Sequence, residues 1–146
     1  MMQLTMLGTG NATVTKCYNT CFLLSENDEY FMIDAGGGNQ ILSILEEQKV
    51  PLTKIHDLFV THSHSDHILG VVWMVRMIGQ MMNKDKYDGE LRIYAHESVI
   101  EDLKATLFIE NGGNLIAPAF CHYGKATLVD CTMIGTTSLH EGYKAY

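Results

Sequence analysis

The sequence lacks the features that mark membrane and secreted proteins. It has no stretch of roughly 18 uninterrupted apolar residues, the length that a transmembrane helix requires. Residues 1–7 have neither the charged start nor the long apolar core of a signal peptide and are typical of an alternating strand. With 47% apolar and 18% charged residues and no repeats, the chain has the composition of a globular protein. We expect a single domain over residues 1–146 and no membrane partner.

Paired cysteines and clustered cations are also missing. The four cysteines do not show the spacing of a zinc ribbon, so free thiols in a reducing cytoplasm are expected. The ten Lys and Arg residues are scattered, and the formal net charge is −7. Strong non-specific binding of nucleic acid depends on clustered cations and is therefore not expected. A nucleotide substrate held chiefly by metal ions remains compatible with this charge.

Two common catalytic and binding arrangements are absent as well. No Ser-His-Asp or Cys-His arrangement is present, because Ser63 and Ser65 lie within a histidine-rich run and lack a free base. The loop Gly8-Thr9-Gly10-Asn11 lacks the third glycine and the following helix of a dinucleotide site. A tight turn is the better explanation of these glycines.

What the chain does have is a dense group of metal-ligand residues. The run Thr61-His62-Ser63-His64-Ser65-Asp66-His67 follows the apolar residues 58–60 and precedes a long apolar segment that begins at Ile68. Imidazole and carboxylate are ligands that suit zinc. His62 and His64, two apart in an extended segment, point the same way. Asp66 lies where a helix begins, so a role as a simple helix cap remains an alternative for it.

This His-x-His-x-Asp-His run is the signature of the metallo-β-lactamase superfamily, and the chain resembles its ribonuclease Z-like branch. The glycine loop 7–11, the strand and turn 31–36, and the segment 138–143 resemble further elements of that family. The resemblance implies an α/β (α+β) fold. Specifically, it implies the N-terminal portion of an αββα sandwich, with a mixed sheet flanked by helices.

The resemblance also implies a set of site residues. His62, His64 and His140 would bind one metal, and Asp66 and His67 would belong to a second. Asp66 would also orient the attacking water, whereas Asp34 would brace the loop and support the ligands without being a principal ligand itself. Two zinc ions are expected in a complete site, with manganese or iron as alternatives. For His140, an ordinary surface position stays open.

The family completes its site with a bridging aspartate and a final histidine beyond the His140 element. Neither precedes Tyr146, so we expect a domain truncated at its C-terminus. The leading hypothesis is a metal-dependent hydrolase that cleaves a phosphodiester, either RNA or a small molecule such as a cyclic nucleotide. The alternatives are a metallo-hydrolase of a thioester, lactone or β-lactam, and a non-catalytic metal-binding fragment or subunit.

Hydrophobic periodicity and turn residues give the expected elements. A helix is expected from Asn39 to Val50-Pro51. The helix 67–82 is apolar on nearly all sides, which together with the resemblance favours a homodimer formed through it. The other expected elements are strands 2–7, 19–25, 30–33, 57–60, 91–95, 127–134 and 137–145, a helix near 97–107, and a loop over 108–126.

Overall fold

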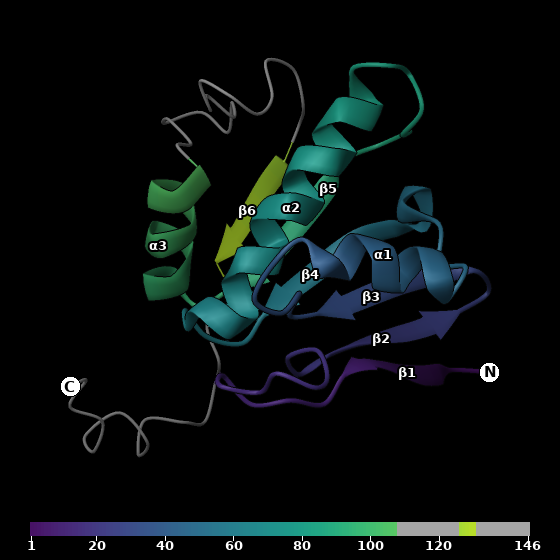
Figure 1. The fold of residues 1–146 in the computed structure, drawn as a ribbon. Coiled ribbons are helices and arrows are strands. Elements are labelled where there is room, and N and C mark those ends of the chain that lie inside the picture. Colours follow the sequence, from purple (N-terminus) through teal and green to yellow (C-terminus); the bar gives the residue numbers. More distant parts are fainter. Residues whose placement is uncertain (108–125, 131–146) are drawn as a thin grey trace.

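A computed structural model of the chain describes residues 1–107 and 126–130, which form one mixed β-sheet with a layer of helices (Figure 1). The strands are β1 (Gln3–Gly8), β2 (Cys21–Glu26), β3 (Glu29–Ile33), β4 (Ile55–Val60), β5 (Leu91–Ala95) and β6 (Ala126–Asp130). The helices are α1 (Gln40–Glu47), the short 3₁₀ helix η1 (Leu52–Lys54), α2 (Ser65–Met82) and α3 (Glu97–Leu107).

The order of the strands in the sheet follows their order in the chain, from β1 to β6. β1, β2 and β3 pair in antiparallel fashion, and β3, β4, β5 and β6 pair in parallel. Each parallel connection passes through a helix and moves one strand further in the same direction. Because such crossovers are almost always right-handed, α1, α2 and α3 are expected on one face of the sheet. Among the described elements, the helices therefore cover one face of the sheet and leave its other face without a helix.

The core lies between the sheet and its helices. Alternate residues of the strands are fully buried on this face, as in Leu23, Met32, Leu58 and Ile93. They share one hydrophobic cluster with residues of α1 and α3 and with the buried stripe of α2, which consists of Ile68, Val71, Met74, Val75 and Ile78. The spacing of this stripe is that of one helix face. The helix predicted as apolar all round thus buries one stripe, while Leu69 on another side is 39% exposed.

The intervening strand residues form the open face of the sheet. The strand register places Leu4, Leu24, Phe31, Asp57 and Arg92 in one row across β1 to β5. Leu4 and Met6 at the β1 edge are 59% and 44% exposed. This face is therefore apolar over β1 to β3, with polar side chains on β4 and β5.

The predicted fold class is confirmed: the sheet is mixed and flanked by helices. Within the described residues, element ends differ from the prediction by up to three residues, and the largest difference is at the end of α1, which stops at Glu47 and not at Val50. The helix expected at 67 begins at Ser65, because His64 is its extended N-cap residue. Residues 127–130 of the strand expected over 127–134 lie in β6. Residues 131–134, His140, the strand 137–145 and nearly all of the loop 108–126 lie outside the described residues. Within the described part, no helix is both long and apolar enough to cross a membrane.

Candidate metal centre

The histidine-rich run lies at the carboxyl ends of the parallel strands. Asp34 directly follows β3, and residues 61–64 connect β4 to the first turn of α2. Neighbouring parallel strands end at the same edge of the sheet, and this edge is where open α/β sheets bind ligands. The topology thus brings together Asp34 and the histidines, although about thirty residues of sequence separate them.

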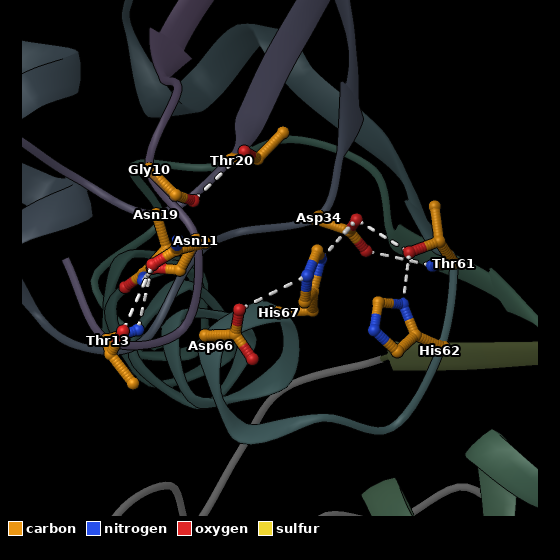
Figure 2. Close-up of polar contacts among 10 residues, drawn as sticks. All are labelled: Gly10, Asn11, Thr13, Asn19, Thr20, Asp34, Thr61, His62, Asp66 and His67. Atoms are coloured by element: carbon orange, nitrogen blue, oxygen red, sulfur yellow. Dashed lines mark hydrogen bonds and ion pairs between the residues drawn. The ribbon is translucent and has the colours of Figure 1, made fainter.

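Asp34 is hydrogen-bonded to residues of both the β4 end and the start of α2 (Figure 2). Its side chain is buried, and its carboxylate accepts three hydrogen bonds: from the Thr61 peptide N–H at 2.8 Å, the Thr61 hydroxyl at 2.7 Å and His67 Nδ1 at 2.7 Å. The Asp34 backbone has φ +53°, a left-handed conformation that is uncommon outside glycine. Its own N–H donates to the Phe59 carbonyl at 2.8 Å. This buried carboxylate therefore fixes both the end of β4 and the orientation of His67.

The imidazole rings of His62, His64 and His67 lie close together beside Asp34. The ring centroid of His62 lies 4.6 Å from that of His64 and 4.0 Å from that of His67. Burial lowers the pKa of His62, and the neighbouring charges of His67 and His64 lower it further. A lowered pKa favours the neutral imidazole, which is the form that binds metals.

Asp66 and His67 face each other in the first turn of α2. His67 Nε2 lies 3.4 Å from Asp66 Oδ2. Since His67 Nδ1 donates to Asp34, a neutral His67 has no proton on Nε2, and two electron-pair acceptors then point at one another. A cation between them would satisfy both. The N-cap residue of α2 is His64, which makes no side-chain capping hydrogen bond, and Asp66 lies in the first turn.

The donor chemistry of these residues fits a divalent metal such as zinc, with neutral imidazole and carboxylate at a strand-to-helix turn. The coordination sphere is not closed, however. Among the residues that the structure describes, no group of three or more His, Cys, Asp or Glu side chains is arranged to hold a metal ion. His140, the third predicted ligand of the first metal, falls outside them. The residues therefore fit a metal by their chemical type and by their closeness to one another, but the described residues do not form a complete set of ligands.

Glycines let the loops around the site pack closely. A Cβ atom on Gly70 of α2 would lie 1.8 Å from the Ala35 carbonyl oxygen, so only glycine allows α2 to approach the Asp34 turn. Two backbone hydrogen bonds join the same segments, from Ala35 N to His67 O at 3.2 Å and from Gly70 N to Gly36 O at 2.8 Å. The start of α2 is thus bound directly to the turn that carries Asp34.

Tyr18 connects this turn to the glycine loop. Its hydroxyl lies 2.8 Å from the Ala35 carbonyl oxygen and 2.7 Å from that of Gly38, and its own carbonyl accepts the Gly10 N–H at 2.8 Å. Burial raises the pKa of Tyr18 to about 12. Sequence reasoning missed both Tyr18 and Thr61. Thr61 directly follows an apolar strand, which is a signal for it, but nothing in the local pattern marks Tyr18.

Comparison with solved structures defines the class of the protein. Human tRNase Z, short form, superposes with a TM-score of 0.64 at 20% identity, covering 89% of this chain and 44% of that chain. A diphosphatase from the PhnP family superposes with a TM-score of 0.65 at 17% identity, covering 90% of this chain and 51% of that one. The metallo-β-lactamase fold protein YhfI from Bacillus subtilis gives a TM-score of 0.62 at 21% identity, covering 88% and 47%. The chain therefore has the metallo-β-lactamase fold.

The sequence narrows this class to a family. Residues 2–115 match the family described as "Anti-Pycsar protein Apyc1", and the chain belongs to that family. It is also similar to ribonuclease Z of Methanothermobacter thermautotrophicus, with 38% identity over 80 residues, which are 54% of this chain and 25% of that protein. Ribonuclease Z of Methanocaldococcus jannaschii is 32% identical over 108 residues, 73% of this chain and 32% of that protein. The predicted ribonuclease Z-like resemblance is confirmed, and the chain spans a quarter to a third of the length of these relatives.

Proposed function

We propose that this chain carries part of the active site of a metal-dependent hydrolase that cleaves a phosphodiester with a metal-activated water. His62 and His64, with His140, would hold one metal ion, and Asp66 and His67 would hold part of a second. When bound, zinc, or manganese or iron in its place, would activate water and polarise a phosphoryl oxygen. Asp66 would orient that water, and Asp34 would keep His67 in position.

One observation carries this proposal: a single buried carboxylate, Asp34, orients His67 directly beside Asp66. Metal-binding histidines commonly donate their second ring nitrogen to a carboxylate, which fixes the ring and its tautomer. The distance of 2.7 Å between His67 Nδ1 and Asp34 Oδ2 is that of a strong hydrogen bond. A histidine that only packed in a core would not require a carboxylate at that nitrogen and a second one near the other.

Phosphodiesters are the preferred substrate class. The names of the similar proteins, ribonuclease Z, tRNase Z and diphosphatase, all refer to phosphoryl substrates. Scattered cations and a net charge of −7 disfavour binding along an extended stretch of RNA. A small phosphodiester such as a cyclic nucleotide therefore suits this chain at least as well as RNA. A thioester, lactone or β-lactam is the alternative substrate class.

Metal binding and turnover test the proposal together. The purified chain would be loaded with zinc or manganese, its metal content measured by mass spectrometry, and its turnover compared on a phosphodiester, a thioester and a β-lactam. Replacing His62 and His64 together by alanine should abolish zinc binding. The matched control replaces His56 and His96, which lie outside the histidine run, and should retain it. Zinc stoichiometry that survives loss of His62 and His64 would refute the assignment.

A non-catalytic metal-binding subunit is the second candidate. The apolar residues of the open sheet face favour it, because a face of this kind is usually covered by further polypeptide. If the chain is such a subunit, we predict that it is a poor catalyst when it is tested alone. Loss of even one supporting group at a metal site commonly lowers metal affinity or activity about 10–100-fold. Robust phosphodiester turnover by the pure chain, abolished in the double histidine variant, would overturn this second candidate.

Self-association through α2 is the proposed oligomeric arrangement. Leu69 of this helix is 39% exposed, and Met77 lines a groove of about 680 Å³ together with Leu42 and Leu52. Burial of these side chains in a symmetric homodimer would remove apolar surface from water. Sedimentation at tens of micromolar should show a dimer, and Leu69→Glu should shift it to monomer. A strict monomer for the unmodified chain would rule this arrangement out.

A further inference from the structure

One hydroxyl group joins the buried carboxylate to a second histidine. Thr61 Oγ1 lies 2.7 Å from Asp34 Oδ2 and 2.9 Å from His62 Nδ1 (Figure 2). The peptide N–H of Thr61 donates to the other Asp34 oxygen at 2.8 Å. The same carboxylate therefore holds Thr61 at two points, which fixes the position of its hydroxyl between Asp34 and His62.

The number of available protons shows which atom donates in the hydrogen bond between Thr61 and His62. A threonine hydroxyl has one proton to donate, and an ionised carboxylate can only accept. The three donors that converge on Asp34 suit its ionised form, so the Thr61 proton points to Asp34. The Thr61 oxygen can then only accept from His62, which places a proton on His62 Nδ1. In the neutral ring, Nε2 then carries an electron pair.

We propose that Thr61 is a positioning residue whose hydroxyl extends the action of Asp34 to His62. One buried carboxylate then sets the tautomer of two histidines, His67 directly and His62 through Thr61. Both rings present an unprotonated Nε2, which is the atom that a cation requires. This inference rests on the proposed metal site and deepens it.

The simpler account is that the Thr61 hydroxyl only satisfies Asp34 and does not affect His62. The two accounts predict different imidazole states. If the hydroxyl sets the tautomer, its removal releases His62 to the Nε2–H form or to a mixture. If it only satisfies Asp34, the His62 tautomer is unchanged. Thr61 is exposed, so its replacement by the similarly shaped valine should leave the fold intact.

Nitrogen NMR of the metal-free protein tests the inference without any turnover. The imidazole ¹⁵N shifts of His62 should show an Nδ1–H tautomer in the unmodified protein and in Thr61→Ser, and its loss in Thr61→Val. Thr20→Val is the matched control, because within the described part of the chain the Thr20 hydroxyl bonds only the Gly10 carbonyl, at 3.0 Å, in the neighbouring loop. An Nδ1–H tautomer that persists in Thr61→Val overturns the inference.

Zinc affinity, measured by competition with a chelating dye, gives the second readout. Thr61→Val should bind zinc about 10–100-fold more weakly, the usual effect of losing a supporting group, and Thr61→Ser should restore the affinity. If His62→Ala abolishes zinc binding while Thr61→Val binds as tightly as the unmodified chain, the positioning role is wrong and the proposed metal site stands. If His62→Ala has no effect on zinc, the proposed metal site fails, and this inference fails with it.

Discussion

Two aspartates on the same sheet each accept three hydrogen bonds, yet their surroundings differ completely. Asp34, at the end of β3, is buried and bonded to Thr61 and His67. Asp57, on β4, lies on the open face, where Arg92 donates to it twice at 2.7 Å and Tyr94 once at 2.8 Å. The side chains of Asp57 and Arg92 remain 23% and 44% exposed.

The difference lies in where the negative charge is compensated. At Asp57 the guanidinium of Arg92 neutralises the carboxylate directly, so the cluster is electrically complete. At Asp34 the described donors carry no fixed positive charge, and the histidines that it orients have acceptor atoms left for a cation. We therefore regard the Asp57 cluster as structural and the Asp34 cluster as part of the proposed metal site.

The same substitution in both aspartates should separate these roles most strongly. Asparagine keeps the shape and tolerates the positive φ of Asp34, but it has one acceptor oxygen fewer and no charge. Asp34→Asn should lower the free energy of unfolding by about 1–3 kcal/mol, because buried donors lose their acceptor. It should also weaken zinc binding by about 10–100-fold.

Asp57→Asn is the matched partner of this test. It should leave zinc affinity unchanged and cost less stability, because water can replace the lost bonds on a half-exposed surface. Urea unfolding and zinc competition measure both quantities. Equal losses of zinc affinity in the two variants would contradict the distinction between the clusters.

A tyrosine pair provides a second and smaller contrast. Tyr18→Phe removes the hydroxyl that bonds the Ala35 and Gly38 carbonyls and should cost about 1–3 kcal/mol, because the buried Ala35 carbonyl loses a donor. Tyr94→Phe removes one of three donors to Asp57 and should cost less, because Arg92 keeps its two bonds. Thermal unfolding of the two variants compares them. A larger loss in Tyr94→Phe would show that the open face contributes more to stability than the loops of the site.

The sequence alone was sufficient to predict most of the elements around Asp34 and the position of the candidate metal site. Apolar periodicity located the strands and helices, and the density of ligands in residues 61–67 located the candidate site. It was not sufficient for Thr61 or Tyr18, because their partners lie about 17 to 27 residues away in sequence. Local patterns do not report such contacts, which depend on the pairing of β3 with β4 and on the packing of α2.

The Asp57 cluster was missed for the same reason, since its members are 35 and 37 residues apart and meet only through the register of β4 and β5. The metal ligation itself stays a prediction. His140 lies outside the described residues, and the sequence signal for it rests on resemblance.

The smallest expected effect is the pH dependence of the Asp57 cluster. Partial burial acts to raise the pKa of Asp57, but hydrogen bonds from Arg92 and Tyr94 and the charge of Arg92 outweigh it and lower the pKa. A carboxyl whose pKa is lower in the folded state stabilises the fold above its unfolded pKa of about 3.9 and loses this contribution as the pH falls through the folded value. Asp57→Asn should therefore be less stable than the unmodified chain at pH 6, and the difference should shrink toward pH 3. Urea midpoints of both proteins at these two pH values measure it. A stability difference that stays constant between them would show that the charge of Asp57 adds nothing to the open face, and that only its shape matters there.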